Sequence, residues 1–118
     1  SDPVRFMETT KTIPQKPDLA VEGVTYGWLS AAIKSTDILH EPGFAKKITT
    51  PILIISAGED HIVSNKAQKK ICSLLPNCRF TEIPEARHEI LRETDAVRSV
   101  FWEEFDRFTD PGSQKILL

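Results

Sequence analysis

Two short polar segments follow predicted strands of the sequence and carry the side chains best suited to acid–base chemistry. The segment GEDHIV brings Glu59 and Asp60 shortly after the aliphatic run 52–55, and the segment PEARHEIL places His88 after a second predicted strand, over 79–83. A carboxylate from one loop can fix the tautomer of a histidine from the next loop and stabilise its protonated form. The histidine would then serve as the base for a nucleophile elsewhere.

The elements that must position these loops alternate between strand and helix. Continuous aliphatic and β-branched residues over 52–55 are typical of a strand buried on both faces of a parallel sheet. Strand–helix alternation predicts right-handed parallel crossovers and an α/β sheet. The predicted order is a strand over 52–55, a helix capped by Ser64 or Asn65, a strand over 79–83 and a helix capped by Thr94.

Two helices are predicted before the first strand. A short helix over 4–10 follows an Asp-Pro pair that suits an N-cap and first helical position, and Pro14 and Pro17 should break it. The second helix begins at Thr25 and ends at 40–43.

Only two strands are visible in the pattern. A two-stranded parallel ribbon has two unpaired edges and little sheet to bury its apolar faces. The sequence therefore predicts that this chain is part of a larger sheet. In the last helix, Phe101, Phe105 and Phe108 are predicted to pack against that sheet.

Composition excludes several functional classes. The 118 residues carry a net charge of -2 with mixed signs, which gives no basic field for nucleic acid, so no nucleic-acid partner is expected. No apolar run approaches the roughly 18 residues that a transmembrane helix needs. The first residues also lack the basic-then-apolar pattern of a signal peptide. These features predict a cytoplasmic protein.

The candidate metal ligands and thiols give no site. Cys72 and Cys78 are too few for a disulfide framework and lack zinc-binding spacing, which predicts reduced, mostly structural thiols. His88 and Glu89 begin a metalloprotease pattern, but Arg92 stands where the second histidine is required. Neither a metal nor a cofactor is expected.

Together the stretches TPILIISAGEDHIV and IPEARHEIL resemble the C-terminal part of an α/β-hydrolase. The resemblance is to the branch that contains lysophospholipases, monoacylglycerol lipases and serine aminopeptidases. It implies that Asp60 is the acid of a catalytic triad and His88 its base. Glu59 is the competing acid, but its position nearer the strand favours a side chain turned away from Asp60. The matching positions are Gly58, Asp60 and Val63 in the acid motif and Ala86, Arg87, His88 and Glu89 in the histidine motif.

The start of the chain resembles the end of the family's helical cap, in SDPVRF, and the stretch returning from it, in VTYGWL. The implied division is a helical cap remnant and return to the core over 1–47, the C-terminal part of the core over 48–110 and a tail over 111–118. Trp28 and Leu29 could line an acyl pocket beside the polar chemistry, or could pack into a core.

The family's nucleophile lies in a GxSxG elbow, and its triad follows the chain order serine, acid, histidine. No GxSxG occurs in the 118 residues, and the order places the nucleophile before residue 1. The resemblance therefore implies the C-terminal fragment of a serine hydrolase for lipid esters such as lysophospholipids or monoacylglycerols, inactive alone. Its expected partners are the missing N-terminal part, the lipid ester and, peripherally, the inner membrane.

Two alternatives stay open at this point. The chain could be a non-catalytic interaction module that completes its sheet by pairing with a second copy. Within the hydrolases, a different nucleophile or cap would give aminopeptidase or epoxide hydrolase chemistry.

Overall fold

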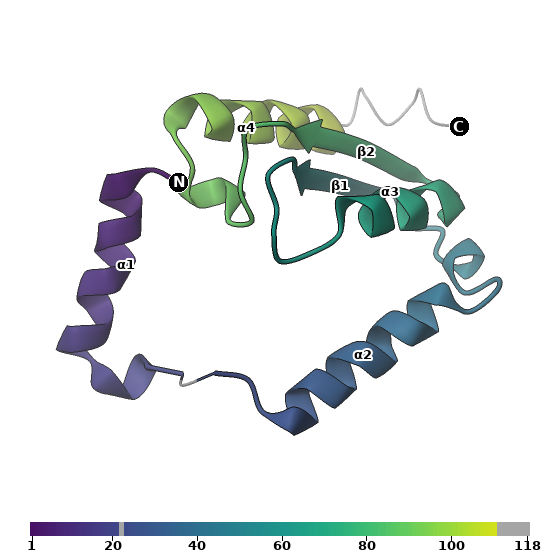
Figure 1. Ribbon diagram of the computed structural model, residues 1–118. Coiled ribbons are helices and arrows are strands. Elements are labelled where there is room, and N and C mark those ends of the chain that lie inside the picture. The colour runs from purple at the N-terminus through teal and green to yellow at the C-terminus, as the bar shows by residue number, and fades with distance from the viewer. Residues whose placement is uncertain (22, 111–118) are drawn as a thin grey trace.

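The computed structural model describes residues 1–21 and 23–110, which form a small sheet between two helices and two further helices that project from it (Figure 1). The predicted tail, 111–118, lies outside the described residues. Within the described part, no helix has the length and apolar character to cross a membrane. In chain order the elements are α1 (Pro3–Gln15), η1 (Pro17–Leu19), α2 (Tyr26–His40), η2 (Ala45–Lys47), β1 (Ile52–Ala57), α3 (Asn65–Leu74), β2 (Cys78–Ile83), η3 (Ile90–Arg92) and α4 (Asp95–Thr109).

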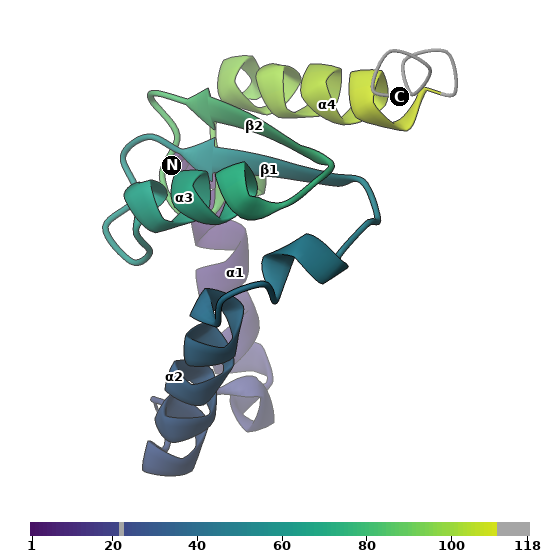
Figure 2. The same cartoon turned by 90° about the vertical axis from the view of Figure 1, so that its right-hand side faces the viewer.

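The two strands pair in parallel, as the alternation of elements predicted. Ile52 lies opposite Cys78 and Ala57 lies opposite Ile83, so the two strands end level with one another. Helix α3 makes the crossover between them and covers one face of the sheet, while α4 covers the other face (Figure 2). The predicted α/β architecture is confirmed in this part of the chain.

The core of this unit lies at the carboxyl ends of the strands. The last two residues of β1 are buried, whereas its first four are only partly buried. The polar loops therefore leave the sheet from its most tightly packed part. The buried members of the core are Ala57, Ile83 and Ala86, and the partly buried side chains packed against them are Ile55, Ile90, Val97 and Phe101.

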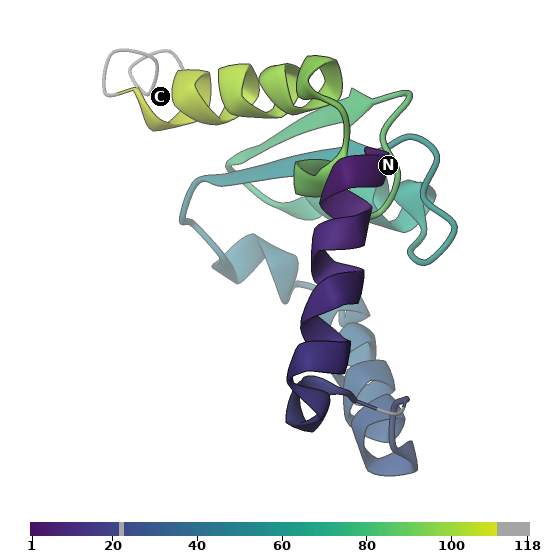
Figure 3. The ribbon, with the colours of Figure 1, turned by 90° about the vertical axis from the view of Figure 1, so that its left-hand side faces the viewer.

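Helices α1 and α2 extend away from the sheet (Figures 1 and 3). No residue of α2 is buried. The radius of gyration is 17.2 Å, whereas a compact domain of this length has a radius of about 13–14 Å. This extended arrangement agrees with the expectation that the chain packs against further structure, which stays a prediction.

Three of the four α-helices begin at a residue predicted from the sequence whose side chain caps the first turn. Asp2 accepts two backbone N–H groups of α1 at 2.9 and 3.1 Å. Thr25 accepts one N–H group of α2 at 3.1 Å, and Ser64 accepts one of α3 at 3.2 Å. Thr94 occupies the corresponding position before α4, but its side chain makes no capping hydrogen bond. Local hydrogen bonds to the first helical turn thus fix three of the starts.

The prediction that Pro14 breaks the first helix is wrong. Helix α1 runs to Gln15 with Pro14 inside it. Pro14 lies in the last turn, and the backbone N–H of Lys16 closes the helix by donating to the carbonyl oxygen of Thr12 at 3.0 Å. The missing N–H of proline therefore costs α1 one bond at its end instead of interrupting its middle.

The prediction that three phenylalanines of α4 pack against the sheet is correct only in part. Phe101 packs against the core and Phe108 is half-buried, but Phe105 is exposed and stacks on Phe101 at a centroid distance of 6.3 Å. Glu104 faces the sheet in its place and accepts a hydrogen bond from the Thr81 hydroxyl at 3.1 Å. The helical period puts residues three and four apart on one face, so either Glu104 or Phe105 could face the strands.

Cys72 and Cys78 form a disulfide, which corrects the prediction of reduced thiols. The end of α3 leads into the start of β2 through a short turn, and the two Cα atoms lie 5.3 Å apart. This separation is within the range that a disulfide spans. The proximity follows from the turn between a helix and a strand, which cysteine spacing alone does not indicate.

Replacing both cysteines by serine should lower the free energy of unfolding by about 2 kcal/mol, because the short closed loop removes that much chain entropy from the unfolded state. Urea unfolding of the oxidised wild-type chain and of the double variant measures the difference. A reducing agent should destabilise the wild type by the same amount and leave the variant unchanged. Equal stability of the two oxidised proteins would contradict the prediction.

Candidate active site

Asp60 and His88 lie side by side in the loops that follow β1 and β2. The Nδ1 atom of His88 is 2.9 Å from Oδ2 of Asp60. The side chain of Asp60 is 3% exposed and that of His88 is 42% exposed. The pair therefore joins a buried carboxylate to an imidazole that is open to solvent.

The carboxylate of Asp60 is fixed by its own loop. Its Oδ1 atom accepts hydrogen bonds from the backbone N–H groups of Ile62 at 2.8 Å and Val63 at 3.1 Å. Such turns, in which an aspartate accepts the N–H two residues on, hold the side chain in one orientation. One oxygen of Asp60 is thus committed to the turn, and the other is presented to His88.

The same hydrogen bonds control the ionisation of Asp60. Removal of water by burial raises the pKa of this carboxyl, but the hydrogen bonds from His88, Ile62 and Val63 outweigh it and lower the pKa from 3.8 to about 2. Asp60 is therefore a carboxylate at neutral pH, and a carboxylate only accepts hydrogen bonds. It follows that Nδ1 of His88 carries the proton of this bond, and that Nε2 of the neutral ring holds a lone pair.

Close contact between the two loops brings the pair together. Gly58 donates its backbone N–H to Ile83 at 2.8 Å, and Glu59 donates its own to Ala86 at 2.9 Å. A Cβ atom on Gly58 would lie 2.4 Å from the carbonyl oxygen of Pro84. Only glycine leaves room for this approach of two backbones.

Glu59, the competing acid, points to a different partner. Its Oε2 atom lies 3.7 Å from Nε of Arg87, and both side chains are more than half exposed. Asp60, and not Glu59, therefore contacts His88 in the structure. The catalytic roles of Asp60 and His88 stay predictions.

Trp28 and Leu29, the predicted pocket residues, are not brought to the Asp60–His88 pair. Both lie in the first turn of α2 and are exposed, at 60% and 44%. Figures 1 and 2 show α2 separated from the loops that follow the strands. Their role in substrate binding also stays a prediction.

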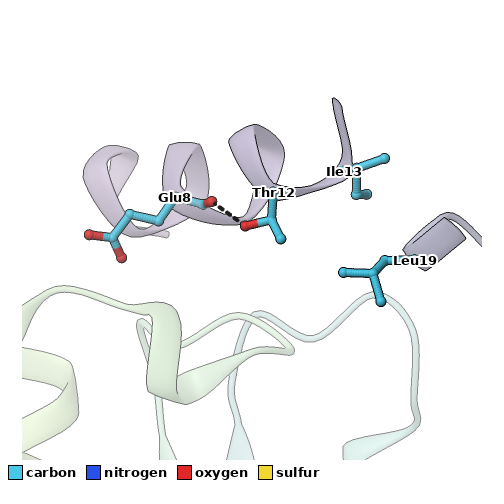
Figure 4. A pocket seen from close by; sticks show the side chains of 4 residues that line it. All are labelled: Glu8, Thr12, Ile13 and Leu19. Atoms are coloured by element: carbon cyan, nitrogen blue, oxygen red, sulfur yellow. Dashed lines mark hydrogen bonds between the residues drawn. The ribbon is translucent and has the colours of Figure 1, made fainter. Parts of the chain in front are cut away.

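Elsewhere in the described chain we find no candidate metal centre and no pocket to which we assign chemistry. Across residues 1–21 and 23–110, no three histidine, cysteine, aspartate or glutamate side chains are placed as metal ligands would be. A shallow hollow at the end of α1 is lined by Glu8, Thr12, Ile13 and Leu19 (Figure 4). The Thr12 hydroxyl there donates to the backbone carbonyl of Glu8 at 3.1 Å, so we assign the hollow no chemistry.

Two polar residues that support the loops were missed from the sequence. The sequence predicts Asn65 only as a possible helix cap, but its amide donates to the carbonyl oxygens of Ala57 at 2.8 Å and Gly58 at 3.2 Å. Glu93 is 4% exposed, and its Oε1 atom accepts the backbone N–H of Arg87 at 3.1 Å. Both residues bind backbone groups six to eight residues earlier in the chain, across a loop, and no pattern of residue types marks such bonds.

A comparison with protein families identifies the fold to which this site belongs. The model of the family described as serine aminopeptidase, S33, matches residues 2–95. The chain belongs to this family. It is 37% identical over 84 residues to a probable lysophospholipase L2 of Haemophilus influenzae, covering 71% of this chain and 26% of that protein. It is 28% identical over 123 residues to lysophospholipase L2 of Escherichia coli, covering 94% of this chain and 35% of that protein.

A solved structure gives the same fold. The match is to a soluble variant of monoglyceride lipase from Saccharomyces cerevisiae in complex with a substrate analogue, with a TM-score of 0.60 and 23% identity. It covers 66% of this chain and 29% of the lipase chain. The predicted membership of the α/β-hydrolases is confirmed, with the chain forming part of that fold. This member of the serine aminopeptidase family spans about a quarter to a third of the length of the curated relatives it matches.

Replacing Gly58 by alanine should destabilise the chain by about 1–3 kcal/mol, because the new methyl group would force the two loops apart. Urea unfolding measures the loss. Gly27→Ala is the matched control, since a Cβ there has no neighbour nearer than 3.8 Å. It should change the stability by at most about 1 kcal/mol. Equal effects of the two substitutions would show that the loops do not need the close approach.

Acid should remove the stabilisation that Asp60 provides. Because its pKa is lowered from 3.8 to about 2 in the folded chain, ionised Asp60 contributes stability above the unfolded-state pKa. That contribution is lost as the pH falls through the folded-state pKa. The difference in unfolding free energy between wild type and Asp60→Asn should therefore shrink on acidification.

Urea unfolding over about pH 2–6 tests this dependence. Glu59→Gln serves as the control, since its exposed carboxylate lies beside Arg87 and not His88. A difference between wild type and Asp60→Asn that stays constant over this range would contradict the assignment.

Proposed function

We propose that this chain supplies the acid and the base of a serine hydrolase that cleaves carboxylic esters of lipids. The hydrogen bond of 2.9 Å between Nδ1 of His88 and Oδ2 of Asp60 carries the proposal. The two residues follow neighbouring parallel strands, and reaction sites of open α/β sheets lie beyond the carboxyl ends of the strands. Membership of the serine aminopeptidase family and similarity to proteins named lysophospholipase L2 support it further.

In this mechanism His88 is the general base. Asp60 holds the proton on Nδ1, so Nε2 removes the proton of a nucleophilic serine hydroxyl as its oxygen attacks the ester carbonyl carbon. Asp60 stabilises the imidazolium that forms. His88 then gives the proton to the leaving alcohol, and water repeats the sequence to release the acid.

The nucleophile and the oxyanion-hole donors would come from polypeptide that precedes residue 1. Support comes from the sequence, which contains no GxSxG, and from the order of the triad along the chain in this superfamily. The chain also spans only 26% and 35% of two relatives. On this proposal residues 1–47 are the end of the cap and the return to the core, residues 48–110 are the end of the core, and the 118 residues alone are inactive.

The proposed substrate is a lysophospholipid or a monoacylglycerol. The relatives that suggest it are named lysophospholipase L2 and monoglyceride lipase. Trp28 and Leu29 would contact the acyl chain once the rest of the enzyme covers α2, because apolar ligand surface needs an apolar groove. A lipid substrate would also bring the enzyme into peripheral contact with the inner membrane, and no nucleic-acid partner is proposed.

The proposed location is the cytoplasm. This location requires the Cys72–Cys78 disulfide to be reduced in the cell. Thiols are kept reduced in the cytosol, whereas disulfides persist in oxidising compartments. Alkylation of the protein in intact cells, followed by mass spectrometry, decides the matter. Two alkylated cysteines support a cytoplasmic location, and an unreactive, bonded pair contradicts it.

Activity of the full polypeptide that contains this chain tests the proposed reaction. Asp60→Asn and His88→Ala should each lower kcat roughly 10⁴-fold on a lysophospholipid or monoacylglycerol. The control Glu59→Gln should change kcat little, because the Glu59 carboxylate lies beside Arg87. A fluorophosphonate probe should label a serine outside the 118 residues.

Three outcomes would contradict this assignment. Full activity of His88→Ala would exclude His88 as the base. Cleavage of aminoacyl amides with no cleavage of lipid esters would change the substrate class to that of an aminopeptidase. An aspartate at the nucleophile position would replace ester hydrolysis with the chemistry of epoxide hydrolases.

A non-catalytic interaction module is the second candidate, and the extended shape of the chain favours it. Within the described residues the sheet has two strands, and α2 has no buried residue. A second copy could cover the open sheet edges and the apolar helix faces. Native mass spectrometry distinguishes the candidates: a second, different polypeptide supports the hydrolase, and a homodimer supports the module.

A further inference from the structure

We propose that Glu93 is a positioning residue for His88, acting through the backbone of the histidine loop. The inference rests on the proposed role of His88 as the base. Glu93 lies between η3 and α4, and its Oε1 atom accepts the backbone N–H of Arg87 at 3.1 Å. Arg87 directly precedes His88, so this bond sets the direction in which the chain enters the histidine.

The carboxylate of Glu93 is built into the interior. The residue is 4% exposed, and its second oxygen, Oε2, lies 3.0 Å from the backbone nitrogen of Ser1. A buried carboxylate is costly unless its oxygens have donors, and both oxygens of Glu93 have one. Such a group is held in one orientation and in turn holds the groups that it binds.

The two members of the catalytic pair are held in different ways. Asp60 is fixed by N–H groups of its own turn, as described above. The histidine loop is held on one side by the β1 loop, where the N–H of Glu59 binds the carbonyl oxygen of Ala86. On its other side the carboxylate of Glu93 binds the loop at Arg87. Loss of that carboxylate would let His88 move relative to a stationary Asp60.

Helix α1 in turn holds the backbone of Glu93. The guanidinium of Arg5 donates to the carbonyl oxygen of Glu93 at 2.8 Å and pairs with Asp95 at 2.5 Å. The N–H of Asp2 donates to the carbonyl oxygen of Arg92 at 3.0 Å. Figure 3 shows the start of α1 beside η3 and the beginning of α4. Glu93 thus links the helix that we propose to be the end of the cap to the loop of the base.

The proton that His88 donates to Asp60 reports directly on this positioning. In NMR spectra of the full polypeptide that contains this chain, Glu93→Ala should raise the rate at which the Nδ1–H of His88 exchanges with water about tenfold, because the backbone N–H of Arg87 loses its acceptor. Glu93→Gln should restore slow exchange, because its amide oxygen can accept the N–H of Arg87. Glu93→Asp keeps the charge on a shorter side chain and should give an intermediate rate, which carries the test if Glu93→Ala does not fold.

Glu104→Ala is the matched control for a loss of stability alone. Glu104 is another largely buried carboxylate, paired with Arg79 at 2.9 Å on the face of α4 that meets the sheet. Its removal should lower the unfolding free energy and leave the exchange of the His88 proton unchanged. Glu104→Ala raising the exchange rate as much as Glu93→Ala would overturn the proposal.

Two further results separate this inference from the proposed function. A protected Nδ1–H signal in the wild type that Glu93→Ala and Glu93→Asp leave unchanged would overturn the positioning role and leave the Asp60–His88 pair intact. Absence of a protected signal in the folded wild type would contradict the pair itself, and the proposed function and this inference would fail together.

Discussion

The parallel pairing of β1 with β2 is the interaction on which the candidate site depends. Ala57 lies opposite Ile83, so the two strands end level and their loops leave the sheet side by side. The absence of a side chain on Gly58 then lets its backbone approach Pro84. A shift in the strand register would separate the loops and the two reactive side chains with them.

The site combines a fixed acid with a more exposed base. The acid is buried and receives three hydrogen bonds, one from the imidazole and two from its own turn, which keep it ionised. The His88 imidazole is 42% exposed to solvent, and on the proposed mechanism this exposure would give a nucleophile access to it. Gly58, Asn65 and Glu93 each form hydrogen bonds to backbone atoms of the two loops or of the strand ends before them. The positions of Asp60 and His88 therefore depend on the backbone of the loops as well as on side-chain contacts.

Much of the fold was predictable because its signals are local. The caps at Asp2, Thr25 and Ser64 bind N–H groups within three residues, and the aliphatic run of β1 marks a strand by composition alone. The errors arose where local rules allow two outcomes. Proline is tolerated in a last helical turn as at Pro14, and a helical period of 3.6 residues cannot decide between Glu104 and Phe105.

Residue types and local patterns are enough to indicate which side chains could do chemistry, the order of the strands and helices, and the strand ends from which Asp60 and His88 project. The folded chain was needed to establish that these two residues, 28 positions apart, meet at 2.9 Å and that the buried Glu93 binds the histidine loop. It was also needed to establish that Cys72 bonds to Cys78 and that α2 lies away from the sheet. The reason is physical: local patterns fix hydrogen bonds within a turn or a helix, whereas these contacts depend on the path of the whole chain and on which surfaces it leaves uncovered.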